Sequence, residues 1–455
     1  MKWHLYDIDK EHKGIKNRKI IAVGLILALL MGVLGGCGNG SLADSTKGAD
    51  STKEGTTSGT QTGTEDTQAG VEGTGNENKA MGRYVESSMD ISEYTTLSCG
   101  VTQLSDGSFV ILDKEAGMLV SGDGGASWRA EAIPGIPDLA AFTKDNYIFT
   151  MKADTDGTIA VLSSPNTDGT GDFHTGLILT GPDGSTRTIP ELTAAEEGYV
   201  HDIWFGPEGR LFAKVMGGSA LYEVDTQSGE MRKYMELPNT PDLIQFQGDY
   251  MILLTAKDGI TFYNMKEEKW VDDAVLADFM RQNYLDDYYC HETFSVYMVP
   301  GEENVIYVAG KGGVYRHAIG GAAMEQIIDG GLSTFSNPSI SIVNMITLEN
   351  NEFMVLFSSG RLVRYTYDPN VPTVPDELVT VYSLREEDKV RQAIAQYQAQ
   401  NPQAFVRYEV GMSGSDAAGR EDAIKKLNTE LMAGAGPDIL ILDGLPMDSY
   451  IEKGV

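Results

Sequence analysis

Between about residue 83 and residue 372, short apolar segments alternate with turns rich in Asp, Gly and Asn. Six of these segments each follow such a turn, and they recur at intervals of roughly 40 to 55 residues, the length of a four-stranded propeller blade. In chain order they are LSDGSFVIL (104–112), DTDGTIAVL (154–162), GPEGRLFAKV (206–215), QGDYMILL (247–254), PGEENVIYVA (300–309) and ENNEFMVLF (349–357). The pattern therefore predicts a mainly β fold, a β-propeller with six blades.

The two ends of this repeat region indicate how the ring closes. The last repeat stops after 360–368 without an obvious fourth strand, whereas 82–92 has the pattern of one extra strand before the first repeat. Pairing that strand into the last blade removes exposed sheet edges, which all-β folds must manage. Seven blades remain an alternative if 265–295 hides a further repeat, although 272–289 has helical periodicity. A β-sandwich is a third reading, with less regular spacing expected.

After a proline-rich linker at 371–377, the pattern changes to alternating strands and helices. Apolar strands are expected at 378–384, 405–410 and 438–446, and amphipathic helices at 386–402 and 422–437. A β-α-β-α-β order predicts a parallel sheet with crossover helices.

This last part of the chain resembles the beginning of a known family. The segments LNTELMAGAGPDILILD (427–443) and YIEKGV (450–455), behind the strands and helices just described, are similar to extracellular solute-binding proteins, the family of maltose- and other oligosaccharide-binding lipoproteins. The resemblance implies that 378–455 is the incomplete N-terminal lobe of an α/β solute-binding domain of the periplasmic-binding type, so the chain is expected to be a fragment. It also implies capture of a small solute, a sugar or oligosaccharide, for the permease subunits of an ABC importer.

Candidate ligand-binding residues follow from the expected sheet. In open parallel sheets, ligands bind beyond the carboxyl ends of the strands. Tyr382 and Ser383 stand at the end of the first strand, and Asp443 and Gly444 follow the third. In the complete family fold, such positions contribute hydrogen bonds and stacking to a sugar. The alternative is that most of them are loop or capping residues.

One motif in the repeat region is specific. The segment SGDGGASW resembles an Asp-box, Ser-x-Asp-x-Gly-x-Ser/Thr-Trp, through Ser121, Asp123, Gly125, Ser127 and Trp128. In such a hairpin the Asp accepts turn amide protons and the Trp packs between blades. Asp-boxes occur in sialidases and also in many non-catalytic propellers, so the motif indicates fold. An Asp-box glycosidase is the least favoured function, because the scattered arginines form no recognisable triad; no catalytic residue is assigned, and we expect a protein that is not an enzyme.

The N-terminus has the features of an export signal. Basic residues precede an apolar run from Ile20 to Leu34, which is shorter than the ~20 residues of a membrane-spanning helix. The run ends in Leu-Gly-Gly-Cys37, which resembles a bacterial lipobox and implies lipidation of Cys37 and anchoring at the extracytoplasmic face of the cell membrane. An uncleaved signal anchor is the alternative. Residues 38–80 are almost wholly polar and are expected to form a disordered tether.

Net charge and cysteine content argue against several classes of binding partner. A net charge of −31 and a pI near 4.5 argue against binding nucleic acid or an anionic membrane surface. Besides Cys37 there are Cys99 and Cys290, whose pairing stays open, and neither the cysteine spacing nor the Asp-rich turns complete a metal site. No metal or cofactor is therefore expected.

These expectations combine into one organisation: a signal peptide at 1–37, the tether at 38–80, a propeller at 81–370, the linker at 371–377 and the incomplete lobe at 378–455. The favoured function is a lipid-anchored solute-binding protein. The main alternative is a propeller-based binding or sensing lipoprotein that is not coupled to transport.

Overall fold

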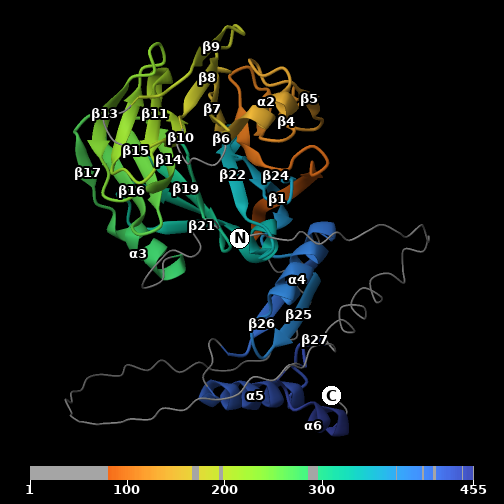
Figure 1. Cartoon of the computed structure of the whole chain (residues 1–455). Helices are drawn as coiled ribbons and strands as arrows, with labels where there is room; N and C mark the ends of the chain where they lie inside the picture. Colours follow the sequence, from red (N-terminus) through yellow and green to blue (C-terminus); the bar gives the residue numbers. More distant parts are fainter. Residues whose placement is uncertain are drawn as a thin grey trace, which may run out of the picture. The chain divides into compact units, whose positions relative to one another are not determined.

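The computed structural model describes residues 80–166, 174–193, 198–284, 296–375, 377–401, 404–412, 417–442 and 444–453 (Figure 1). The predicted signal peptide with Cys37, and the tether as far as residue 79, lie outside these ranges. So do Cys290 and Asp443. Within the described residues, no helix is both long enough and apolar enough to cross a membrane.

Six four-stranded antiparallel sheets form the blades of a propeller, which confirms the six-bladed prediction for the described residues (Figure 1). Within each blade the strands are hydrogen-bonded in the order given, starting from the innermost. The first blade contains β2 (Ser98–Gln103), β3 (Phe109–Asp113), β4 (Gly117–Ser121) and β5 (Arg129–Glu131), and the second contains β6 (Asn146–Ala153), β7 (Ile159–Pro165), β8 (Gly176–Thr180) and β9 (Thr186–Ile189). The third contains β10 (Val200–Phe205), β11 (Leu211–Val215), β12 (Ala220–Val224) and β13 (Met231–Glu236), and the fourth contains β14 (Pro241–Gln247), β15 (Tyr250–Thr255), β16 (Gly259–Asn264) and β17 (Lys269–Val271). The fifth contains β18 (Tyr297–Pro300), β19 (Val305–Gly310), β20 (Gly313–Ala318) and β21 (Met324–Asp329), and the last contains β22 (Ile342–Thr347), β23 (Phe353–Phe357), β24 (Arg361–Pro372) and β1 (Met81–Asp90).

The first strand of the propeller closes the ring. β1 pairs antiparallel with β24 from Arg83 opposite Asp368 to Asp90 opposite Arg361, as the sequence predicted. The carboxylate of Glu86 on β1 also accepts hydrogen bonds from the backbone N–H and the hydroxyl of Thr334, at 2.5 and 2.9 Å. The last blade is thus completed by the opposite end of the propeller sequence, and no covalent bond holds the two together.

The apolar repeats that revealed the fold are the second strands of the blades. β3, β11, β19 and β23 are buried at every position. Each lies inside its own sheet and is covered on both faces by neighbouring blades, so it needs apolar side chains on both faces and shows no alternation. The core of the propeller is therefore made of layers between successive blades.

Short helices connect some of these strands. α2 (Leu139–Asp145) links the first two blades, and the short 3₁₀ turns are η1 (Pro207–Gly209), η3 (Gly330–Leu332), η4 (Thr334–Ser336) and η5 (Glu349–Asn351). α3 (Ala274–Asn283) lies between β17 and β18 and buries Leu276 and Met280. It falls within the helical insert predicted at 272–289, of which 285–289 is outside the described residues.

A buried hydrogen-bonded pair, Asp273 and His317, holds α3 to the fifth blade. Asp273 caps the helix by accepting from the backbone N–H of Leu276 at 3.0 Å. Its other carboxylate oxygen lies 2.8 Å from Nε2 of His317 and accepts from the backbone N–H of Gly320 at 2.7 Å. The Asp273 and His317 side chains are only 4% and 0% exposed. The contact therefore joins two segments that are distant in the sequence.

The hairpin between β4 and β5 carries the residues of the predicted Asp-box. Asp123 accepts hydrogen bonds from the hydroxyl groups of Ser127 and Ser121, at 2.5 and 2.8 Å, and from the backbone N–H of Ser127. These bonds, led by those from Ser127, lower the pKa of Asp123 to about 2. Ser121 in turn accepts from the N–H of Gly125, and Trp128 donates to the carbonyl of Gly125 at 3.2 Å. Trp128 packs between the first and last blades; membership of the Asp-box class stays a prediction.

The C-terminal part is a small parallel sheet with helices. Its strands are in the order β26-β25-β27, and both outer strands run parallel to β25. The elements are β25 (Glu377–Ser383), α4 (Asp388–Gln400), β26 (Ala404–Val410), α5 (Ala417–Met432), β27 (Ile439–Leu440) and α6 (Met447–Lys453). The alternation of strands and helices is as predicted, but three strands and three helices do not show a lobe of the periplasmic-binding type. β27 is much shorter than the expected strand at 438–446.

Candidate functional site

A cavity of about 200 Å³ lies at the carboxyl ends of β25 and β27. It is formed by the loop between β25 and α4, the first turns of α5 and the segment after β27. The lining residues are Ser383, Leu384, Arg385, Glu387, Arg420, Ile441 and Gly444. This is the edge at which an open parallel sheet presents its ligand site, because the loops that leave the strands meet there.

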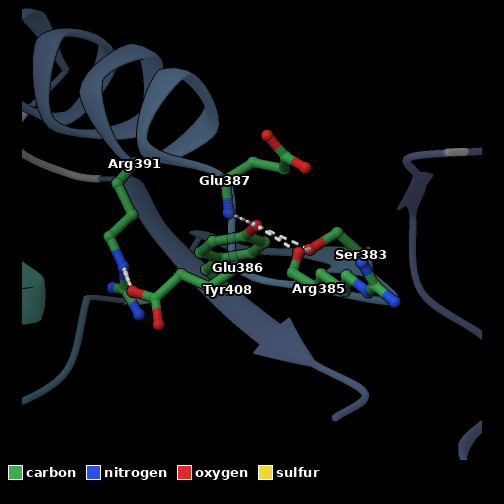
Figure 2. Close-up of polar contacts among 6 residues, drawn as sticks. All are labelled: Ser383, Arg385, Glu386, Glu387, Arg391 and Tyr408. Atoms are coloured by element: carbon green, nitrogen blue, oxygen red, sulfur yellow. Dashed lines mark hydrogen bonds and ion pairs between the residues drawn. The ribbon is translucent and has the colours of Figure 1, made fainter. Parts of the chain in front are cut away.

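Hydrogen bonds from the neighbouring strand fix the loop after β25 (Figure 2). The hydroxyl of Tyr408 on β26 lies 2.6 Å from the hydroxyl of Ser383 and accepts from the backbone N–H of Glu387 at 3.0 Å. Ser383 donates to the carbonyl of Arg385 and is only 2% exposed. Ser383 and Tyr408 therefore hold the loop in place, and their hydroxyl groups are used within the protein.

A second hollow lies on the other side of the same loop. Its volume is about 680 Å³, and it is lined by Arg385, Glu386, Arg391, Tyr408, Val410, Gly411 and Met412. Arg391 on α4 pairs with the carboxylate of Glu386, and its guanidinium lies 5.2 Å from the centre of the Tyr408 ring (Figure 2). Arg391 thus completes the support of the loop from the helix side. Because Arg385 lines both spaces, its guanidinium can reach a ligand from either.

The charged groups at the cavity differ in how far they are already used. Arg420 donates to the carbonyl of Gly444 at 2.7 Å and so ties α5 to the segment after β27. The guanidinium of Arg385 and the carboxylate of Glu387 make no hydrogen bond to any residue that the structure describes. A guanidinium supplies up to five N–H donors and a carboxylate only acceptors. The cavity can therefore both donate hydrogen bonds to a polar ligand and accept them from it.

Of the four predicted ligand-binding residues, the structure places two at the cavity. Ser383 and Gly444 line the cavity, and Asp443 lies outside the described residues. Tyr382 does not reach the cavity: it is 6% exposed and packs in an apolar cluster that includes Leu427. Burial raises the pKa of its phenol, and its hydroxyl has no hydrogen-bond partner among the described residues. Side chains alternate across a strand, so neighbours such as Tyr382 and Ser383 point to opposite faces.

Sequence reasoning missed Arg385, Glu387 and Arg420. Arg385 and Glu387 follow the expected strand within a few residues, so their place in the loop was available as a signal. The sequence offered no such signal for Arg420, because this residue belongs to a helix that begins earlier than residue 422, the predicted start. In the part of the chain that the structure describes, no cluster of three or more His, Cys, Asp or Glu side chains could hold a metal ion.

No protein-family model matches the sequence, and no curated protein matches it. Among solved structures, the chain is similar to YCF48 bound to D1 peptide, with 13% identity, a TM-score of 0.40, and coverage of 62% of this chain and 97% of the other. It is similar to a streptogramin B lyase with 10% identity, a TM-score of 0.40 and coverage of 63% and 98%. It is also similar to a soluble aldose sugar dehydrogenase from Escherichia coli, with 11% identity, a TM-score of 0.38, and coverage of 63% of this chain and 100% of the other. Similarities this low carry no argument about function.

Proposed function

We propose that this protein is a lipid-anchored extracellular binding protein whose C-terminal α/β segment captures a small polar solute, a sugar or part of an oligosaccharide, for an ABC importer. One observation carries the proposal: the Arg385 guanidinium and the Glu387 carboxylate make no hydrogen bond to a described residue, and both residues line a cavity with Arg420 at the carboxyl ends of parallel strands. That is where open parallel sheets bind ligands.

The chemistry and the size of the cavity support a small polyhydroxylated ligand. Each sugar hydroxyl both donates and accepts a hydrogen bond, which suits a site with guanidinium donors beside a carboxylate acceptor. A volume of about 200 Å³ is below the range of roughly 300–1,000 Å³ common for small-molecule sites. The cavity therefore suits one sugar ring better than a long oligosaccharide.

We propose binding without catalysis at this site. Among the described residues that line the cavity, Ser383 alone has a hydroxyl side chain. A nucleophilic serine needs an adjacent general base. Among the described residues, its hydroxyl instead contacts the phenol of Tyr408 and the carbonyl of Arg385.

Sugar binding is tested by replacing Arg385 with alanine. Titration calorimetry of the full chain with glucose, galactose, maltose and xylobiose should show binding of at least one sugar. Arg385→Ala should weaken it roughly tenfold or more, because a hydrogen bond to a charged group contributes about 1.5–3 kcal/mol. Arg385 is exposed, and its guanidinium makes no hydrogen bond or ion pair with a described residue, so the substitution should leave folding unaffected.

Arg407→Ala is the matched control, because Arg407 is an exposed arginine on β26 that pairs with Glu409 and does not line the cavity. The affinity of the Arg407→Ala variant for the sugar should equal that of the unmodified chain. If none of the four sugars binds, the proposal fails. If Arg385→Ala removes no component of the sugar binding that the unmodified chain shows, the propeller-based binding or sensing protein is favoured instead.

The lipid anchor is tested by Cys37→Ser. The lipobox-like Leu-Gly-Gly-Cys37 sequence supports a thioether-linked lipid at this residue. Expressed in a bacterium with a lipoprotein export pathway, the unmodified chain should remain with the membrane fraction, whereas Cys37→Ser should be released into the medium or the periplasm. Asn39→Ser, two residues after Cys37, serves as a control and should leave the protein on the membrane. Membrane retention of Cys37→Ser would disprove lipid anchoring.

A further inference from the structure

The inner strands of the propeller carry polar and charged side chains where they face the axis. Inner strands of neighbouring blades lie side by side: β2 with β6 and β22, β6 with β10, and β18 with β14 and β22. Lys152 on β6 and Asp202 on β10 form an ion pair with 3.8 Å between Nζ and Oδ1, and their side chains are 27% and 24% exposed. Lys152 also interacts electrostatically with Cys99 on β2 and Tyr297 on β18, so its charged end lies where inner strands of several blades converge on the axis.

The side of the axis formed by the last blades is already hydrogen-bonded. Tyr297 on β18 accepts from the side-chain amide of Asn344 on β22 at 2.8 Å. The carbonyl oxygen of Asn344 accepts from the backbone N–H of Val101 on β2 at 3.0 Å. These bonds join the fifth, sixth and first blades and hold the phenol of Tyr297 in place.

On the Lys152–Asp202 side of the axis, part of the hydrogen-bonding capacity of the side chains is unused. At 3.8 Å the contact of Lys152 with Asp202 is longer than a normal hydrogen bond, and Lys152 donates no hydrogen bond to any other described residue. Asp202 Oδ1 accepts from the backbone N–H of Ile203 at 2.8 Å, whereas Oδ2 has no donor among the described residues. An ammonium has three N–H donors and a carboxylate about four acceptor positions. A donor and an acceptor with unused capacity thus stand side by side at the axis.

Electrostatic interactions connect Lys152 with both Asp202 and Tyr297. Burial by itself lowers the pKa of Lys152, but the carboxylate of Asp202 outweighs this effect and leaves that pKa above its usual value. Burial raises the pKa of Tyr297, on which the charges of Lys152 and Asp202 both act. The phenol therefore lies within electrostatic reach of the ion pair from another blade.

We infer that the propeller axis is a second binding site, for a neutral polyhydroxylated ligand such as a monosaccharide, held between Lys152 and Asp202. Neighbouring hydroxyl groups of a sugar accept from the Lys152 ammonium and donate to Asp202 Oδ2, which uses the capacity that the protein leaves open. A ligand with a net charge is disfavoured, because the ion pair already balances its own charge and an additional charge at the axis has no counter-ion. The site is separate from the C-terminal cavity and does not depend on it.

The test uses the full chain carrying Arg385→Ala, so that the C-terminal cavity does not contribute. Saturation-transfer NMR and thermal unfolding are measured with glucose, galactose, mannose and N-acetylglucosamine, and with the ethylammonium cation and the acetate anion as probes that carry a net charge. At least one sugar should bind and raise the Tm, and ethylammonium and acetate should not. Adding Lys152→Met or Asp202→Asn should weaken sugar binding tenfold or more.

Lys266→Met is the matched control, because Lys266 pairs with Asp249 at a similar distance of 3.9 Å but is largely exposed. It should leave sugar binding unchanged. The inference is overturned if no sugar binds, if ethylammonium or acetate binds in place of a sugar, or if both axial variants retain their affinity for the sugar. Lower stability of the axial variants with unchanged affinity also overturns it, because that result shows a purely structural ion pair.

Discussion

Deletion of the closing strand β1 (Met81–Asp90) is expected to abolish cooperative thermal unfolding of the propeller. The deletion leaves β24 with an unpaired edge along its length and removes the Glu86 carboxylate from Thr334. It also removes Tyr84, whose ring packs on Phe353 with 5.6 Å between ring centres. The expected loss is at least ~5 kcal/mol, comparable to the whole stability of a small domain.

Scanning calorimetry and gel filtration measure this effect. The deletion variant should show a broad or absent transition and should associate, because an open edge strand pairs with other chains. Removal of ten residues from the predicted tether, 61–70, is a control of equal length and should leave the transition unchanged. A sharp transition in the β1 deletion, at the original temperature, would show that the other five blades are stable without closure.

Asp273→Ala is expected to lower the free energy of unfolding by about 2–4 kcal/mol, the combined cost of a lost N-cap and of buried hydrogen-bonding groups left without a partner. The substitution removes the N-cap of α3 and the acceptor of Gly320. It also leaves Nε2 of His317 buried without its partner, while Nδ1 still faces the carbonyl of Ala323 at 2.9 Å. The helix and the fifth blade thereby lose their shared polar contact.

The same variant should have a different pH dependence. Burial by itself raises the pKa of Asp273, but hydrogen bonds from Leu276, His317 and Gly320 outweigh it and hold the pKa below its usual 3.8. A carboxyl with a lowered pKa stabilises the fold fully above its unfolded value, and this contribution is lost as the pH falls through the folded value. Stability should therefore fall less steeply below about pH 4 in Asp273→Ala than in the unmodified chain.

Urea unfolding at pH 7 and pH 3 measures both effects. Asp272→Ala is the control, since Asp272 is the preceding residue and is exposed; its effect should stay within ~0.5 kcal/mol. If Asp273→Ala and Asp272→Ala unfold at the same urea concentration, the buried pair does not stabilise the protein.

The blades could be predicted from the sequence because the signal is local. Each second strand is buried on both faces and follows a tight turn, so an apolar run with a turn before it recurs once per blade. Closure by β1 was also predictable, because a strand was missing at one end of the repeats and extra at the other. The first feature depends on residues that are neighbours in the sequence, and the second on comparing the strands at the two ends of the repeat region.

The candidate sites could be predicted only in part, because they depend on strand direction and register. The carboxyl edge of the parallel sheet was found, but the face of each residue was not: Tyr382 was expected to contact ligand and packs in the core. The axial pair was missed entirely. Lys152 and Asp202 stand on different inner strands, each of which has an irregular register, at Ile148/Thr150 and Val200/Asp202. Such shifts change the face of every later residue and leave no trace in the pattern.

The register of the closing ladder also has a mechanical consequence. Met81 lies opposite Pro372, and Thr373 donates a backbone hydrogen bond to Ala80 at 2.8 Å, so the polypeptide arrives at and departs from the propeller at one corner. Pulling these two ends apart loads the hydrogen bonds between β1 and β24 one after another, because in an antiparallel pair they lie perpendicular to the strands. The ring is therefore opened most easily by a force between its two flanking segments, and it resists most strongly a force that slides β1 along β24.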